Sequence, residues 1–165
     1  RNAYYEMMAS KLGLIFEEDG EEYISLVDEL LSIMESEKLD YSATFITLEE
    51  SLQESPEEES AHALLSLPLQ QWRSSWLEII DSSKTNLNEV ITRMRAQNPS
   101  VIPRNHLVEQ LIGIYELDPT GDSAKAHLES FLTVLSDPYN IKARLTEFCR
   151  SPMHIDETYR TFCGT

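Results

Sequence analysis

The amino-acid sequence predicts an all-α protein, and three observations support this prediction. Apolar residues recur at intervals of three and four along most of the chain, which is the spacing of one face of an α-helix. Residue types that commonly cap helices precede several of these runs. No stretch of useful length alternates apolar and polar residues in the manner of a half-buried β-strand.

Two helices are expected before residue 40. The first covers about residues 3–12, where Tyr5, Met8 and Leu12 share one face. Gly13 follows it in a position that often takes a left-handed conformation. The second helix is the most regular, and its apolar stripe consists of Ile24, Val27, Leu30, Leu31 and Met34.

A third helix should begin at Asp40, which is placed as an N-cap. Residues 54–60, beyond this helix, carry several acids and no apolar side chain, so that burial cannot offset the entropy of ordering them. We therefore expect a mobile acidic loop near 54–60. The buried face of the third helix is predicted to consist of Tyr41, Phe45, Leu48 and Leu52.

Two further helices are expected before residue 98. After Pro68, the indoles of Trp72 and Trp76 lie one turn apart on the same side of a helix. They could form a patch for a partner protein, but packing in the core is the favoured interpretation. Asn86 followed by Glu89 resembles a capping box at the start of the next helix.

The second half of the chain predicts an antiparallel helical pair. Residues 107–115 form an apolar face that is interrupted by Gly113, for which a close helix crossing would be an explanation. Turn residues at 118–122 precede a second helix over about 124–135, which must end before Pro138. The two helices should therefore pack side by side.

The chain is long enough for one domain, or for two subdomains. We assign residues 1–97 to a helical subdomain, and residues 98–150 to a connector, a helical hairpin and a short helix around 142–149. Residues 151–165 show little periodicity and are assigned to an extended C-terminal tail.

An irregular, proline-containing connector joins the two halves. Pro99 and Pro103 lack an N–H and push the residues before them toward extended geometry, which forbids a continuous helix. Asn105 is placed to cap the next helix, and Arg104 is expected to pair with a carboxylate. A structural role is favoured for this motif, which consists of Asn98, Pro99, Pro103, Arg104, Asn105 and His106.

The composition argues against several classes of partner. Twenty-nine acids against thirteen Lys and Arg residues give a net charge of −16, which repels nucleic acid and anionic membrane surfaces. No apolar run approaches the ~20 residues that span a bilayer, and no signal peptide opens the chain, so that a soluble protein is expected. Two cysteines, Cys149 and Cys163, fit a reducing compartment.

Several motifs occur together in a fixed order: Asn-Pro, Ile-Pro-Arg-Asn-His, an amphipathic helix, a Gly-Asp turn, a helix ending in Asp-Pro-Tyr, and a terminal Thr-Phe-Cys-Gly-Thr. This order resembles the C-terminal region of the selenoprotein O (SelO/YdiU) family. Residues 5–14 and 39–48 look like the segments that follow the catalytic core of that family. The likeness covers nearly the whole chain and is weakest over residues 54–86.

The resemblance implies a protein-kinase-like fold and the transfer of AMP from ATP onto hydroxyl side chains of other proteins, with ATP and Mg or Mn as cofactors. Arg1 is not an initiator methionine, and the first helical pattern begins almost at once, so we expect a fragment of a longer chain. The expected fold is therefore an all-α, multi-helix C-terminal domain of a larger kinase-like protein. Its implied partners are the kinase-like core of the same chain and the protein substrates of the parent. The family suggests a cytoplasmic location in bacteria and a mitochondrial one in eukaryotes.

No catalytic, cofactor-binding or metal-binding residue is assigned within this sequence. Its five glycines are scattered, no glycine-rich phosphate loop occurs, and no strand is available for a phosphate-pairing lysine. Cys149, His154 and Cys163 match no zinc spacing and lack a fourth ligand. The fragment alone is therefore expected to have no enzymatic activity and no cofactor of its own.

Cys163 is the sharpest site hypothesis. The resemblance implies that this tail cysteine takes part in redox control by pairing with a cysteine of the kinase-like core. No neighbouring base in the sequence indicates a lowered pKa for its thiol. A redox function and an unreactive exposed thiol therefore have equal support.

Two functions from different classes follow. The first is the structural and regulatory C-terminal part of a SelO-type protein adenylyltransferase. The second is an independent acidic helical module that binds a partner peptide without nucleotide chemistry. A kinase-like core encoded upstream of Arg1 would favour the first, and an unrelated domain there would favour the second.

Overall fold

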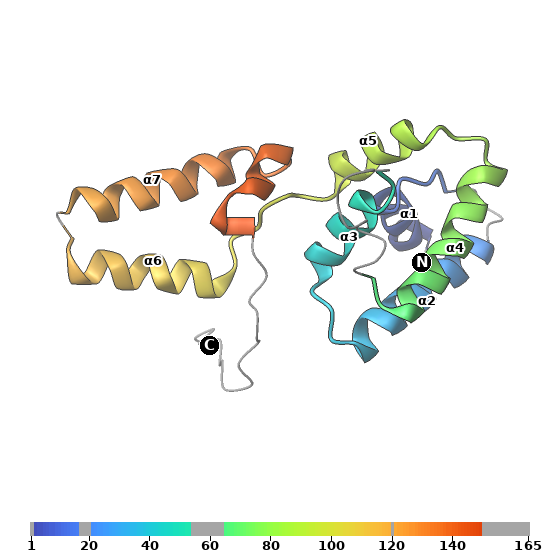
Figure 1. Ribbon diagram of the computed structural model, residues 1–165, viewed down its shortest axis with the longest axis horizontal. Coiled ribbons are helices and arrows are strands. Elements are labelled where there is room, and N and C mark those ends of the chain that lie inside the picture. Colours follow the sequence, from blue (N-terminus) through green and yellow to red (C-terminus); the bar gives the residue numbers. More distant parts are fainter. Residues whose placement is uncertain (1, 17–20, 54–64, 120, 150–165) are drawn as a thin grey trace. The chain divides into compact units, whose positions relative to one another are not determined.

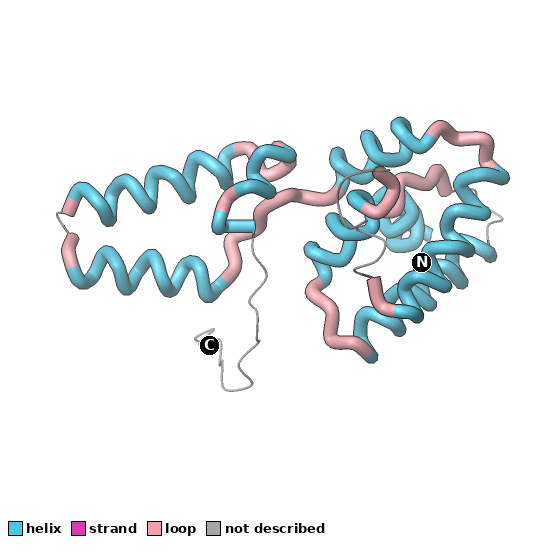
Figure 2. The backbone as a smooth tube through the Cα atoms, in the orientation of Figure 1, coloured by secondary structure: helices cyan, strands magenta, loops and turns pink. Residues whose placement is uncertain are grey.

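The computed structural model describes residues 2–16, 21–53, 65–119 and 121–149 (Figures 1 and 2). These residues form seven α-helices and two 3₁₀ helices and contain no β-strand, which confirms the all-α prediction. None of the helices in this part of the chain is both long and apolar enough to cross a bilayer. The predicted acidic loop and C-terminal tail lie outside the described residues.

The chain divides into two compact units, residues 1–98 and residues 99–165, each with its own apolar core. In the first unit α1 packs against both α2 and α5, α2 packs against α4, and α3 packs against α5. The bounds are Asn2–Lys11 for α1, Glu21–Ser36 for α2, Tyr41–Glu50 for α3, Leu67–Ser82 for α4 and Leu87–Gln97 for α5.

The two tryptophans lie in the centre of the first core, so the prediction that they pack internally is confirmed. Trp72 and Trp76 are almost fully buried, and their rings stack with centroids 5.6 Å apart. Each indole N–H reaches a carbonyl of another segment: Trp72 Nε1 donates to Leu26 O at 2.8 Å, and Trp76 Nε1 donates to Leu12 O at 3.2 Å. A buried indole needs such an acceptor.

Two predicted N-caps are confirmed. Asp40 precedes α3, and its Oδ1 accepts a backbone N–H of the first turn at 2.7 Å. Asn86 precedes α5, and its Oδ1 accepts from Asn88 N at 2.8 Å. The carboxylate of Glu89 lies 3.5 Å from Arg93 instead of completing a capping box. Each side chain satisfies a backbone donor that the helix start leaves without an intrahelical partner.

Left-handed residues follow α1 and α2. Gly13 has φ 73°, as its position after the first stripe predicts, and the N–H of Leu14 donates to Ala9 O at 2.9 Å. This bond closes a Schellman motif. Lys38 takes the same role after α2 with φ 54°, although its side chain makes that conformation costly.

The second unit contains the predicted antiparallel pair. Helix α6 (Asn105–Leu117) packs against α7 (Asp122–Ser136), as Figure 1 shows. Two short 3₁₀ helices follow, η2 (Ile141–Leu145) and η3 (Glu147–Cys149), where the sequence predicts one short helix.

The core of the second unit is small, and α6 is less buried than its apolar pattern predicts. Ile112 and Tyr115 belong to the predicted apolar face but are about half exposed. The expected close crossing at Gly113 is wrong, because no atom beyond its own helix backbone lies within 4 Å of the position that a Cβ would take there. Among the described residues, the buried cluster that forms this core consists of Val101, Leu107, Phe131, Ala143 and Phe148.

Candidate functional site

Asn98, the first residue of the connector motif, joins the ends of two helices within the first unit. Its side chain is 4% exposed, and its Nδ2 donates to Lys11 O at 2.8 Å and to Met94 O at 2.9 Å. These carbonyls lie at the C-terminal ends of α1 and α5, and Met94 O also accepts the backbone N–H of Asn98 at 2.9 Å. Asn98 Oδ1 accepts from Lys11 Nζ at 3.2 Å. The amide therefore uses both of its polar atoms in holding α1 to α5.

Lys11 completes this junction and was not identified from the sequence. Its Nζ donates to Gln97 O at 3.3 Å and lies 5.6 Å from the centroid of Tyr41 and 5.4 Å from that of Phe45. Two aromatic faces and two oxygens thus surround the ammonium group. Burial lowers the pKa of Lys11 from its ordinary 10.5. The contacts join residues that are far apart in the chain, so no local pattern could reveal them.

The next part of the connector is held within the second unit. The N–H groups of Ser100 and Val101 both point at Pro138 O, at 2.7 and 3.3 Å. Arg144 Nε donates to Ser100 Oγ at 3.4 Å. Ser100 and Val101 are buried, and Pro99 is half-buried. The extended chain here therefore runs against the segment that follows α7.

The remaining motif residues start α6. The prediction that Asn105 is the N-cap is wrong by one residue: Asn105 is the first helical residue, and Arg104 holds the N-cap position with φ −69° and ψ 137°. Arg104 O accepts two N–H groups of the first turn at 3.0 and 3.1 Å. Pro103 and Asn105 are exposed, whereas Arg104 and His106 are half-buried. Asn98 thus joins helix ends within the first unit, and Arg104 holds the N-cap position of α6 within the second.

An ion pair between a buried carboxylate and a partly exposed guanidinium joins α3 to α5. Glu49 is 1% exposed, and its Oε1 lies 2.8 Å from Arg95 Nη2 and 2.9 Å from Arg95 Nε. Gln53 Nε2 donates to the same oxygen at 3.0 Å. A buried charge is tolerated when such partners compensate its lost hydration. Sequence reasoning missed this pair because the partners lie on different helices.

Arg73 supports the same region from α4. Its Nη2 donates to Ser51 O at 2.6 Å, and its Nε donates to Ser51 Oγ at 2.9 Å. Ser51 is the C-cap of α3, so a cation meets the negative end of that helix dipole. Burial lowers the pKa of Arg73. The buried and partly buried charged side chains described here thus hold helices of the first unit together.

A pocket of about 270 Å³ lies in the first unit beside the end of α1. Its one basic lining side chain is Arg93, whose Nη1 donates to Gly13 O at 3.3 Å and whose Nη2 lies 3.5 Å from Glu89. The pocket is lined by Glu6, Ser10, Leu14, Ile15, Phe16, Arg93, Ala96 and Gln97.

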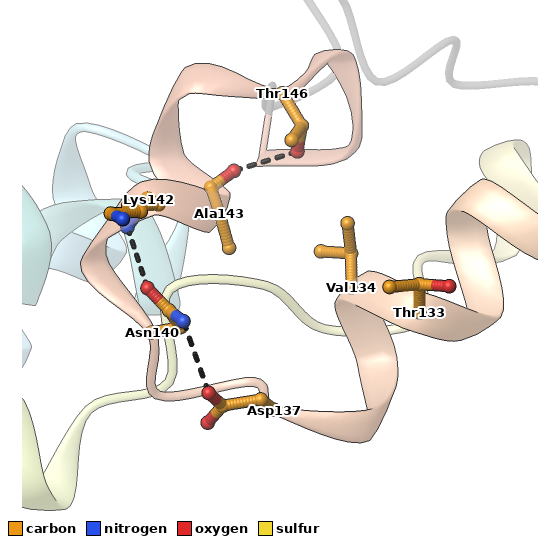
Figure 3. A pocket seen from close by; sticks show the side chains of 7 residues that line it. All are labelled: Thr133, Val134, Asp137, Asn140, Lys142, Ala143 and Thr146. Atoms are coloured by element: carbon orange, nitrogen blue, oxygen red, sulfur yellow. Dashed lines mark hydrogen bonds between the residues drawn. The ribbon is translucent and has the colours of Figure 1, made fainter.

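A second pocket of about 200 Å³ lies in the second unit between the end of α7 and η2 (Figure 3). The side chain of Asn140 bridges its rim: Nδ2 donates to Asp137 Oδ2 at 3.0 Å, and Oδ1 accepts from Lys142 N at 3.0 Å. Val134 and Ala143 point toward one another across the hollow. Its lining residues are Thr133, Val134, Asp137, Asn140, Lys142, Ala143 and Thr146.

Neither pocket fits a nucleotide with its divalent cation. Such a site combines donors for several phosphate oxygens with carboxylates that hold the metal. The charged lining residues are Glu6 and Arg93 in one pocket, and Asp137 and Lys142 in the other. Among the described residues, no three His, Cys, Asp or Glu side chains are grouped closely enough to hold a metal ion.

The remaining sequence candidates are only partly placed. Cys149 is half-buried and packs against the second core. His127 Nε2 lies 3.7 Å from Glu147 Oε1, and its ring meets Phe148 edge-on at 5.6 Å. Cys163, like His154, lies outside the described residues, so its redox role stays a prediction.

Comparisons with known proteins identify the family. The family model described as "Protein adenylyltransferase SelO" matches residues 1–133. A relative from Geobacillus kaustophilus named "Protein nucleotidyltransferase YdiU" is 36% identical over 159 residues, which cover 96% of this chain and 30% of the relative. Relatives of the same name from Bacillus cereus and Bacillus mycoides are 35% and 31% identical, over 96% and 99% of this chain.

The chain thus spans about 30% of the length of these relatives. The match extends through both units, because the family model covers all of the first and more than half of the described part of the second. The chain belongs to the SelO family.

Proposed function

We propose that this chain is the helical C-terminal part, structural and regulatory in role, of a SelO-type protein adenylyltransferase. The parent transfers AMP from ATP to Ser, Thr or Tyr hydroxyls of other proteins, and a kinase-like core outside this chain performs the chemistry. One observation carries the proposal: the chain belongs to the SelO family but spans only about 30% of its relatives. This favours a part of an adenylyltransferase over an independent peptide-binding module.

The arrangement of polar groups supports a structural role. Asn98, Lys11 and the Glu49–Arg95 pair all hold helices of the first unit to one another. Catalytic groups, in contrast, are positioned around a cleft where a substrate can reach them. Neither described pocket has the donors that ATP and Mg or Mn require. We assign the nucleotide and metal to the parent, which also binds the protein substrates.

The test compares the parent with the 165-residue chain. Both are incubated with radiolabelled ATP, Mg²⁺ or Mn²⁺ and candidate protein substrates, and transfer of labelled AMP is measured. We expect transfer by the parent and none by the chain alone. Calorimetric titration with Mg-ATP should likewise detect binding only to the parent. Transfer by the chain alone, or a parent without transfer, would contradict the proposal.

The redox role of Cys163 is a separate part of the proposal and rests on the family resemblance alone. Oxidation should slow AMP transfer by the parent, and a reductant should restore it. A parent carrying Cys163→Ser should lose this response, whereas Cys149→Ser should keep it. Equal responses in the two variants would leave Cys163 as an ordinary surface thiol.

A further inference from the structure

The hairpin of the second unit exposes four large apolar side chains on one face. Ile112 and Tyr115 of α6 are 51% and 47% exposed, and Leu128 and Leu132 of α7 are 37% and 55% exposed. Their spacings of three and four residues place each pair on one side of its helix. We call these four residues the hairpin face.

The two pairs lie on the same side of the hairpin. Leu111 packs against the core of this unit, and Phe131 of α7 belongs to that core. The residue after each of them, Ile112 or Leu132, is an exposed member of the face. One residue further along an α-helix is a rotation of about 100°. The two helices are antiparallel. For this reason, residues rotated by the same angle away from the α6–α7 contact lie on the same side of the hairpin. The four side chains of the hairpin face therefore lie on the same side of the hairpin.

The core of the second unit is too small to account for the apolar stripes of both α6 and α7. Among the described residues, its core has five buried residues, one of which is an alanine, and five partly buried residues pack against them. Ordering a segment of this length costs far more conformational entropy than so few side chains recover on burial. An apolar stripe on both helices of a pair normally packs against a further layer. The hairpin face is thus expected to have a cover in the intact protein.

We infer that the cover is a segment of the parent protein outside this chain. The relatives extend over roughly three times the length that the chain spans, so most of the parent is available to pack here. A second copy is disfavoured because each chain carries a net charge of −16. The hairpin, residues 105–136, has five carboxylates and one lysine. The complementary segment is apolar at its centre and flanked by Lys or Arg. This inference rests on the proposed function only in requiring a longer parent.

The test measures how fast single cysteines at the face react with a thiol reagent. Ile112→Cys and Leu132→Cys report on the face. Leu117→Cys is the matched control, since Leu117 is 89% exposed and lies on α6 five residues beyond Ile112, a rotation of about 140° around the helix. Each substitution is made in the parent and in the 165-residue chain. Peptide-resolved mass spectrometry separates the introduced cysteines from the natural ones.

In the parent, we expect Ile112→Cys and Leu132→Cys to react about tenfold or more slowly than in the 165-residue chain, because the cover must open first. Leu117→Cys should react equally in both. Equal rates at all three positions would overturn the inference. Slow reaction at Ile112→Cys and Leu132→Cys in the isolated 165-residue chain would also overturn the inference, because the cover would then lie within this chain. If that protection increased with protein concentration, the cover would be a second copy. AMP transfer by the unsubstituted parent is assayed in parallel, because its absence contradicts the proposed function and leaves the labelling result intact.

Discussion

Gly13 combines two constraints that a side chain would break. Its φ is 73°, and a Cβ there would lie 2.6 Å from Val90 O and 2.5 Å from Val90 Cγ1. Gly13→Ala therefore adds backbone strain to a clash with α5, and should lower the free energy of unfolding by about 2–3 kcal/mol. Urea denaturation followed by tryptophan fluorescence measures this change, because both tryptophans lie in the first unit.

Gly113 provides the matched control for that substitution. It lies inside α6 with open space where a Cβ would be placed. Gly113→Ala should stabilise α6 by about 0.5–1 kcal/mol, which slower amide exchange in α6 would reveal. If both alanine variants changed stability in the same direction, the explanation from φ and contact would fail.

Lys38 offers the opposite test of backbone conformation. It takes a left-handed φ of 54° after α2 although it has a Cβ. Lys38→Gly relieves this strain and should raise the free energy of unfolding by roughly 0.5–1 kcal/mol. Glu35→Gly, an exposed position inside α2, should instead lower it by about 1 kcal/mol. A loss in both variants would mean that φ at Lys38 carries little strain.

Lys11 should give the first unit a measurable pH dependence. Burial lowers its pKa below 10.5, so the unfolded chain keeps this proton to a higher pH than the folded chain. Stability therefore rises with pH between the folded-state pKa and 10.5, and the full cost of burial is present below that window. Lys11→Met removes the titrating group and should abolish the rise.

Tyr41 also affects stability in this pH range, so its titration must be removed before the contribution of Lys11 can be measured. Burial is the main cause that raises the pKa of Tyr41 above 10.0, and the neighbouring Tyr4 adds to it. Stability consequently falls as the pH rises past 10.0, in opposition to Lys11. Urea titrations across this range are therefore compared in Tyr41→Phe backgrounds, which keep a ring beneath Lys11. Parallel stability profiles with and without Lys11 would refute the assignment.

At the scale of helices, Asn98 is expected to act as a clamp between α1 and α5. Its Nδ2 satisfies the carbonyls of Lys11 and Met94 at the ends of those helices. Asn98→Ala removes the side-chain donor from both carbonyls, leaves Met94 O only the backbone N–H of residue 98, and should cost about 2 kcal/mol of unfolding free energy. Asn88→Ala, at an exposed position of α5, should change stability by less than about 0.5 kcal/mol. If the two variants lost similar amounts of unfolding free energy, the bonds of Asn98 would contribute no more to stability than an exposed side chain does.

The helices themselves are largely predictable from local patterns. Asp40 and Asn86 begin helices as their residue types indicate, and the stripe through Leu30 is buried as its spacing requires. Local patterns failed at Asn105 and Gly113. A one-residue shift of a helix start depends on backbone contacts around Pro103, and burial at Gly113 depends on which side of α6 meets α7, which its own sequence does not specify.

Contacts between distant residues were beyond sequence reasoning. The surroundings of Lys11 come from α3 and from the end of α5, and the Glu49–Arg95 pair spans two helices. Periodicity assigns a residue to the buried or the exposed side of its own helix, but it does not tell which partner it meets. The connector motif was therefore recognised as a family feature, while the geometry that Asn98 builds was not foreseen.

At the scale of the whole chain, the two units differ in how much apolar surface they bury. Within the part of the chain that the structure describes, the first core contains 21 buried residues, including Trp72 and Trp76, and the second contains five. Apolar burial is the main favourable term in folding. In the isolated chain, the first unit should therefore be much more stable than the second. Hydrogen exchange should be slow in α2 and α4 and fast in α6 and α7. Equal protection would contradict this ranking.

A chain shortened to residues 1–98 should accordingly fold alone. It keeps the first core and Asn98, whose polar side-chain contacts all lie within the first unit. Its urea midpoint, followed by tryptophan fluorescence, should match that of the 165-residue chain. A chain shortened by one further residue, to Gln97, loses the bonds of Asn98 and should unfold with about 2 kcal/mol less stability. If the tryptophan emission of residues 1–98 were that of exposed indoles, the first unit would need later residues in order to fold. The division at Asn98 would then not mark the end of an independently folding unit.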